Sequence, residues 1–208
     1  MRRIGLAALA VLAAGICGCG APRPVKYYVL DSPPPTPPAA SQPLPVNLLV
    51  ARVFTSHLYR DDRIVFGSGP VQLGTYEMER WASSPADIIQ DMLVSYLQAT
   101  GEYSAVSRIG SSSRGDYVVR SNLLALYEVD KPELVARFSL HLELFDRKAG
   151  AVVWASSYSH DEPVNGKTVP AVVEAMDRNV RAGLQQLTAG LGQYFAEHPP
   201  QPPAASAK

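Results

Sequence analysis

Cysteine is scarce in this chain of 208 residues, and its two copies, Cys17 and Cys19, both lie near the start. Beyond Cys19 the sequence has no thiol, so intrachain disulfides cannot hold the body of the protein together. A hydrophobic core has to provide the stability instead. With 47% hydrophobic residues, the chain has enough apolar material to build one.

The sequence also lacks an excess of charge of either sign, because its 19 basic and 19 acidic side chains cancel. A protein that binds nucleic acid through the phosphates gathers a basic excess on one face. The arginines here, such as Arg108, Arg114 and Arg120, are scattered and form no such track. Nucleic acid is therefore not expected as a partner.

Long apolar runs are lacking except near the start, where Ile4–Ile16 is apolar or glycine for thirteen residues. As a helix this run spans about 20 Å, which is short of the roughly 30 Å hydrocarbon layer of a bilayer. Arg2 and Arg3 precede it, and a basic start followed by a short apolar run is typical of a secretion signal peptide. A membrane-spanning anchor is the alternative, and the length disfavours it.

The residues after this run match the pattern that lipoprotein signal peptidase recognises. Ile16 supplies the branched apolar residue three positions before Cys19, and Gly18 supplies the small residue directly before it. Cys17 does not fit this pattern, because Ile16 is too large to stand directly before the cleaved bond. We therefore expect cleavage between Gly18 and Cys19, with acyl chains on Cys19 that anchor the mature chain.

This assignment divides the start of the chain into a signal peptide, residues 1–18, and a short lipidated tether, residues 19–24. The residue after Cys19 is Gly20, and an aspartate there would favour retention in the inner membrane. Its absence favours a lipid anchor in the outer membrane, with the protein facing the periplasm.

Motifs for catalysis and cofactor binding are lacking as well. The sequence has no Gly-x-Ser-x-Gly elbow, no His-Glu-x-x-His pair and no phosphate loop. His160–Glu162 is a tight group of potential ligands, but a metal site needs three or four that converge, so this group is expected in water at a strand end. Asp61 and Asp62 lie between arginines and indicate a turn. We expect no enzyme, no metal site and no cofactor.

Proline is plentiful but uneven, since most of the 18 copies lie in residues 33–45 and 199–203. Such a segment forms neither a helix nor a central strand, so 33–45 is expected to be an extended or mobile loop. Residues 198–208 are expected to be a tail without core residues. One domain, residues 25–197, lies between the tether and this tail.

Apolar and β-branched runs predict strands through most of that domain. The expected strands are residues 25–30, 46–54, 63–66, 71–80, 103–109, 117–129, 134–146 and 151–158. Residues 134–146 alternate most clearly, with Phe138, Leu140 and Leu142 on one side and Arg137 and His141 on the other. Short connections join the last three strands, which predicts an antiparallel meander.

Two further stretches carry apolar residues every three or four positions and predict helices, one from Pro85 to about Gly101 and one from Pro170 to Ala196. Ser84 and Asp87 have the spacing of a capping box at the start of the first. The expected fold is therefore α+β: an antiparallel or mixed sheet with both long helices packed on one face.

Four segments, in this order, resemble a known family. They are the lipobox followed by Tyr27–Asp31, the motif His57–Phe66, the segment Tyr76–Ala82, and the helix that begins at Pro85. The family is that of the ABC-type transport auxiliary lipoproteins, which includes the PqiC-like subunits of membrane-integrity transporters. The chain departs from the family pattern at Arg60–Asp62 and at Ser83–Ser84, while the order of elements agrees from Val25 to about Phe195.

This resemblance implies a non-enzymatic lipoprotein that works with an ABC transporter and an MCE-type protein in moving lipid between the two membranes, and so supports outer-membrane integrity. Two other functions stay open: docking or assembly in another envelope secretion or export machine, and a lipid-anchored hydrolase. A homo-oligomer also stays open.

The most family-like region, residues 61–81, is the expected partner interface, with Tyr76, Met78, Arg80 and Trp81 as its candidate residues. Large aromatic side chains suit an interface as well as a core. Trp81 directly precedes the helix cap, where an aromatic residue more often packs in the core. Arg80 would then point outward or pair with Asp87.

Overall fold

A computed structural model describes residues 23–31, 33–34, 42–67, 71–110 and 114–200. The expected signal peptide, the cleavage site and Cys19 lie outside the described residues. So do residues 35–41 of the proline-rich loop, residues 68–70 of the expected hairpin turn, and residues 201–208 of the tail.

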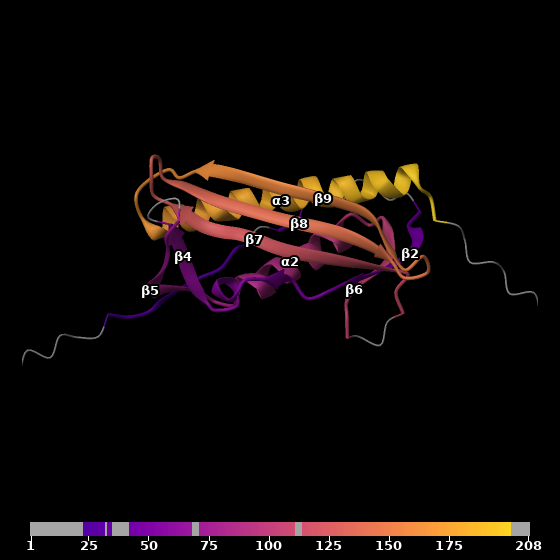
Figure 1. Ribbon diagram of the computed structural model, residues 1–208, viewed down its shortest axis with the longest axis horizontal. Coiled ribbons are helices and arrows are strands. Elements are labelled where there is room, and N and C mark those ends of the chain that lie inside the picture. Colours follow the sequence, from indigo (N-terminus) through magenta and orange to yellow (C-terminus); the bar gives the residue numbers. More distant parts are fainter. Residues whose placement is uncertain (1–22, 32, 35–41, 68–70, 111–113, 201–208) are drawn as a thin grey trace, which may run out of the picture.

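The described chain forms one mixed sheet and a layer of two long helices (Figure 1). The sheet strands are β1 (Lys26–Tyr28), β2 (Leu44–Val50), β3 (Phe54–Thr55), β4 (Arg63–Gly67), β5 (Leu73–Trp81), β6 (Tyr103–Arg108), β7 (Tyr117–Val129), β8 (Val135–Asp146) and β9 (Ala151–Pro163). The helices are the short 3-10 turn η1 (His57–Tyr59), α2 (Pro85–Ala99) and α3 (Val169–Glu197).

The long strand β7 is the central strand of the sheet and pairs with four other strands of the described chain. Along one edge it pairs antiparallel with β8, which pairs antiparallel with β9, and this is the predicted meander. Its other edge is shared by three short parallel partners: β2 at residues 117–119, β3 at 122–123 and β4 at 128–129. The sheet therefore forks beyond β7, with β6 beside β2 in one branch, and with β5 and then β1 beside β4 in the other.

Both long helices cover the same face of the sheet, and Figure 1 shows them behind β7, β8 and β9. The alternation of β8 explains this arrangement, because Phe138, Leu140 and Leu142 are fully buried on the helix side. α3 meets them with a stripe of fully buried residues: Met176, Val180, Leu184, Leu191 and Phe195. The α+β fold with two helices on one face is the one that the sequence predicts.

The helix starts follow from local hydrogen bonds. Asp87 N–H donates to Ser84 Oγ at 3.2 Å, and Ser84 Oγ donates to the Asp87 carboxylate at 2.7 Å, so the capping pair at α2 forms. At α3, Thr168 Oγ1 accepts from the backbone N–H of Ala171. Pro85 and Pro170 lie in the first turns, where a helix needs no N–H donor.

The expected strand at residues 46–54 is wrong in its bounds. β2 begins two residues earlier, at Leu44, and the chain leaves it after Val50 before forming β3. Pro45 therefore lies in a strand and not in the loop 33–45. It is tolerated there because the register of β2 against β6 shifts between Leu44 and Asn47, so no ladder hydrogen bond is needed at the proline.

The last strand is also longer than expected, since β9 runs to Pro163 rather than Tyr158. His160–Glu162 therefore lies within the last four residues of β9, near its end as expected, and His160 and Asp161 are exposed. Both acids of this group form ion pairs: Asp161 with Arg137 at 2.6 Å, and Glu162 with Arg178 at 2.9 Å.

Candidate functional site

Arg80 holds the base of the β4–β5 hairpin. Its Nη1 donates to both carboxylate oxygens of Asp62, at 2.9 and 3.2 Å, and the backbone N–H of Trp81 donates to the carbonyl of Asp62 at 2.6 Å. The expectation that Arg80 points outward or pairs with Asp87 is therefore wrong. The antiparallel pairing of the two strands brings Asp62 beside residues 80 and 81, while Asp87 is engaged in the cap of α2.

Trp81 belongs to the core, where only 1% of its surface is exposed. The side chain cannot contact a partner unless the fold opens. Its contribution is to stability, because it is one of the largest fully buried side chains of the core.

Tyr76 lies half-buried next to a buried acid. Its hydroxyl donates to Glu128 Oε2 at 2.8 Å, and its ring packs on Phe66 with centroids 4.9 Å apart. Burial raises the pKa of Glu128, the hydrogen bond from Tyr76 opposes that rise, and the charge of Asp130 adds to it. Burial and Glu128 together raise the pKa of the Tyr76 hydroxyl.

Met78 is the candidate that reaches solvent, with 39% of its surface exposed. The structure thus removes Trp81 from the predicted interface, whereas Tyr76, Met78 and Arg80 are alternate residues of β5 and are partly or largely exposed. Trp81 is buried, Tyr76 is engaged with Glu128, Arg80 is engaged with Asp62, and Met78 lies outward on β5.

Beside Met78, the edge strand β1 carries exposed apolar side chains that sequence reasoning did not single out. β1 pairs parallel with β5, Lys26 Nζ lies 3.1 Å from Glu79 Oε1, and the Tyr28 hydroxyl donates to Glu79 Oε2 at 2.6 Å. Burial and the nearby Glu79 raise the pKa of Tyr28 to about 12, and the same hydrogen bond lowers the pKa of Glu79.

We define the N-terminal apolar edge as Val25, Tyr27, Val29 and Met78. Tyr27 is 64% exposed and Val29 is 61% exposed, although the alternate residues Tyr28 and Leu30 pack against the core. The sequence itself could have revealed this edge, because residues 25–30 are apolar or aromatic on both sides of the chain apart from Lys26, and such a strand needs a cover on both sides.

A serine, a histidine and a carboxylate lie together on the face of the sheet away from the helices. His141 Nδ1 lies 2.8 Å from Ser157 Oγ, and His141 Nε2 lies 3.3 Å from Glu143 Oε1. Nucleophilic catalysis also needs N–H donors aimed at the oxyanion of the reacting group. β8 pairs on both of its edges, so its backbone N–H groups lie in the plane of the sheet and point at neighbouring strands.

The same face carries a shallow hollow of about 260 Å³ near Phe54. Two cross-strand pairs of β7 and β8 line it, Arg120 opposite Glu143 and Asn122 opposite His141. The Arg120 guanidinium stacks on the Phe145 ring, 4.0 Å from its centroid. The hollow is open and holds charges of both signs, so it does not select one class of ligand.

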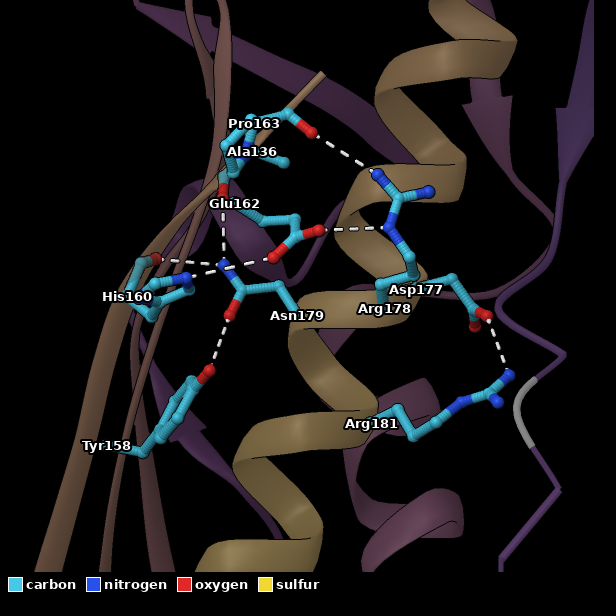
Figure 2. A network of polar contacts seen from close by, with 9 residues as sticks. All are labelled: Ala136, Tyr158, His160, Glu162, Pro163, Asp177, Arg178, Asn179 and Arg181. Atoms are coloured by element: carbon cyan, nitrogen blue, oxygen red, sulfur yellow. Dashed lines mark hydrogen bonds and ion pairs between the residues drawn. The ribbon is translucent and has the colours of Figure 1, made fainter. Parts of the chain in front are cut away.

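The densest polar network joins α3 to the outer strands (Figure 2). Asn179 is fully buried, and its amide donates to the carbonyls of Ala136 and His160 at 2.8 and 2.9 Å, while its oxygen accepts from Tyr158. Arg178 donates to Glu162 and to the Pro163 carbonyl. The buried amide of Asn179 thus finds its hydrogen-bond partners within the protein, and the network fixes α3 on the sheet.

Neither a metal cluster nor a membrane-spanning helix occurs in the described part of the chain. Over residues 23–200, with the gaps given above, no three His, Cys, Asp or Glu side chains gather closely enough to hold a metal ion. No helix among the same residues is long and apolar enough to cross a bilayer.

Comparisons with known proteins agree with this architecture. Residues 28–188 match the family model described as "ABC-type transport auxiliary lipoprotein component". A search of the curated proteins gave no match.

Among solved structures, a Xanthomonas campestris protein is similar at 21% identity and a TM-score of 0.74, covering 83% of this chain and 99% of its own. An uncharacterized protein has 15% identity, a TM-score of 0.59 and the same coverage. A hypothetical protein from Chlamydia trachomatis has 9% identity and a TM-score of 0.51, with 74% and 99% covered. At these identities the likeness concerns the fold.

Proposed function

The chain belongs to the family of ABC-type transport auxiliary lipoprotein components, and from this membership we propose that it is a non-enzymatic, lipid-anchored subunit of an intermembrane lipid transport system. In this proposal it faces the periplasm from the outer membrane, docks an ABC transporter and an MCE-type protein, and supports outer-membrane integrity. The match over residues 28–188 carries the proposal, because it spans nearly all of the folded domain.

The start of the sequence supports the anchoring part of the proposal. A lipobox that ends at Cys19 precedes the first strand by only six residues, so an acylated Cys19 would keep the folded body close to a membrane. A protein held there can contact membrane components continuously, which suits an auxiliary subunit.

The non-enzymatic part is supported by the geometry around His141. The chain of hydrogen bonds through Ser157 and Glu143 lies on an open sheet face, and the backbone N–H groups of β8 are directed at β7 and β9 rather than at that face. Purified protein should hydrolyse short-chain p-nitrophenyl esters no faster than its Ser157→Ala variant. Ester hydrolysis that Ser157→Ala abolishes would make the lipid-anchored hydrolase the better function.

The proposed binding to an ABC transporter and an MCE-type protein is tested by affinity purification of the full-length tagged protein from detergent-solubilised envelopes. We expect an MCE-type protein and ABC transporter subunits among the co-purified proteins, identified by mass spectrometry. The matched control is the Cys19→Ala variant, which should lose them because it carries no lipid anchor for the outer membrane. Recovery of secretion or export components in their place would overturn the proposal.

A further inference from the structure

We propose that the N-terminal apolar edge, formed by Val25, Tyr27, Val29 and Met78, lies against the lipid bilayer in which the protein is anchored. This inference rests on the lipid anchor of the proposed function and adds a second, side-chain contact with the membrane. It assigns the exposed side of β1 to a lipid surface rather than to a protein.

The first observation is that this side is apolar although the fold leaves it uncovered. Tyr27 lies in β1, Val25 directly precedes the strand and Val29 directly follows it, and the three alternate in sequence with Lys26, Tyr28 and Leu30. Tyr27 and Val29 expose 64% and 61% of their surfaces, and Met78 on the neighbouring strand exposes 39%. Isolated exposed apolar residues are common, but four such residues in β1, in its flanking positions and in the adjacent β5 form a patch that favours an apolar environment.

The second observation is the position of this patch along the chain. Five residues separate Cys19 from Val25, and the six steps between the two residues span at most about 20 Å in any conformation. An acylated Cys19 lies in the bilayer, so Val25 cannot be far from the headgroups. Figure 1 shows the described chain beginning at the end of the molecule where β4 and β5 lie, opposite the end of α3.

The third observation is the chemistry of the patch and its margin. Tyrosine is enriched where membranes meet water, because its ring is apolar and its hydroxyl remains hydrated. Arg23 is exposed directly before the patch, and Lys26 keeps 63% of its side chain exposed. Basic side chains at such a margin favour anionic headgroups.

The test uses an environment-sensitive dye on the lipidated protein in vesicles of phosphatidylethanolamine and phosphatidylglycerol. Signal cleavage removes Cys17 and acylation blocks Cys19, so a cysteine introduced by Tyr27→Cys or Val29→Cys is the one thiol left to label. Phe54→Cys is the matched control, because Phe54 is 67% exposed and lies on β3. We expect blue-shifted emission and protection from aqueous iodide at positions 27 and 29, and neither change at position 54.

The outcomes separate this inference from the proposed function. Mass spectrometry and dye stoichiometry first report on the anchor, since a protein with an unmodified Cys19 takes up a second dye, and that result would count against the proposed function. If the lipid is present and position 27 is as accessible as position 54, the membrane contact is wrong while the anchor stands.

A second copy of the chain could also cover the patch. In that case position 27 would become protected without vesicles, in the mature chain with Cys19→Ser, and more so at higher protein concentration. This result would overturn the inference. Protection that requires vesicles and is independent of protein concentration supports it.

Discussion

At the scale of single residues, the clearest consequence of the fold is that Glu128 is buried beside Tyr76. Only 7% of its surface is exposed, and burial raises its pKa above the ordinary value. An acid whose pKa is higher in the folded protein favours folding while it is protonated, and it loses that contribution as the pH rises through the folded pKa. At neutral pH the charge of Glu128 therefore costs stability.

We predict that Glu128→Gln increases the free energy of unfolding at pH 7 and has little effect near pH 4. The amide oxygen can still accept the Tyr76 hydroxyl, so the hydrogen bond remains while the buried charge is lost. Denaturant unfolding at a series of pH values measures the difference between variant and wild type. Glu77→Gln is the control: Glu77 is an exposed acid on β5, next to Tyr76, and this variant should show no such difference.

Trp81 and Met78 differ in burial, and a pair of variants separates their roles. Trp81→Ala should lower the free energy of unfolding by about 3–5 kcal/mol, because it empties a fully buried site. Met78→Asp changes an exposed side chain and should stay within about 0.5 kcal/mol of wild type. Thermal melting and partner pull-down are measured on both. If residues 76–81 contribute an interface, Met78→Asp weakens the pull-down while its melting stays normal.

Arg80→Glu is a poor probe of the same interface. The substitution would place a second carboxylate against Asp62 at the base of the hairpin and remove the donor that holds it. Any loss of partner binding would then follow from local destabilisation. The sequence could not show this, because the partner of Arg80 lies eighteen residues earlier and depends on the pairing of β4 with β5.

At the scale of elements, α3 approaches the sheet most closely along a line of small residues. Ala175 and Asn179 are fully buried, and Gly183 is buried one turn further along. A Cβ on Gly183 would lie 2.7 Å from Tyr158 Cδ1 and 2.8 Å from Phe138 Cε1. The glycine is therefore required by the closeness of the helix and the strands rather than by its backbone conformation.

We predict that Gly183→Ala lowers the free energy of unfolding by about 1–2 kcal/mol, although alanine is the better helix former by about 1 kcal/mol. Gly190→Ala in the same helix is the matched control. Its added Cβ would meet Trp154 at 3.4 Å, an ordinary contact, so this variant should be neutral or up to about 1 kcal/mol more stable. Chemical denaturation distinguishes the two. Equal stability of both variants would contradict the close packing at Gly183.

The sequence predicts the elements whose pattern is set by their own residues. The alternation around Phe138 and the stripe of α3 each belong to one long element with one buried face, so periodicity identifies them. The short strands depend on their partners instead. β2, β3 and β4 each pair with a different part of β7, and nothing in their own residues specifies where along β7 they lie. The break after Val50 was missed for this reason.

The candidate site was predicted less well than the fold, for a related physical reason. Aromatic and charged residues near Trp81 are compatible with both a core and a surface, and only the pairing of the hairpin decides between them. The apolar edge at Tyr27 was hidden because the run Val25–Leu30, in which Lys26 is the one charged residue, indicates burial on both sides, whereas β1 lies at the edge of its branch, next to β5.

At the scale of the whole molecule, the two ends of the described chain lie far apart. The chain enters beside β4 and β5, and α3 ends at the opposite end of the molecule (Figure 1). An anchor at Cys19 would therefore hold one end of the domain at the membrane and direct the other end away from it. The proposed contact with the bilayer therefore depends on which cysteine carries the lipid.

We predict that Cys19→Ala abolishes incorporation of a palmitate analogue, whereas Cys17→Ser keeps both processing and label. The reason is steric: Gly18 fits the position directly before the cleaved bond, and Ile16, which precedes Cys17, does not. Metabolic labelling followed by membrane fractionation measures label and location together. Cys19→Ala protein should be unlabelled and either soluble or unprocessed. Label retained by Cys19→Ala and lost from Cys17→Ser would move the anchor to Cys17 and lengthen the tether by two residues, about 7 Å when extended.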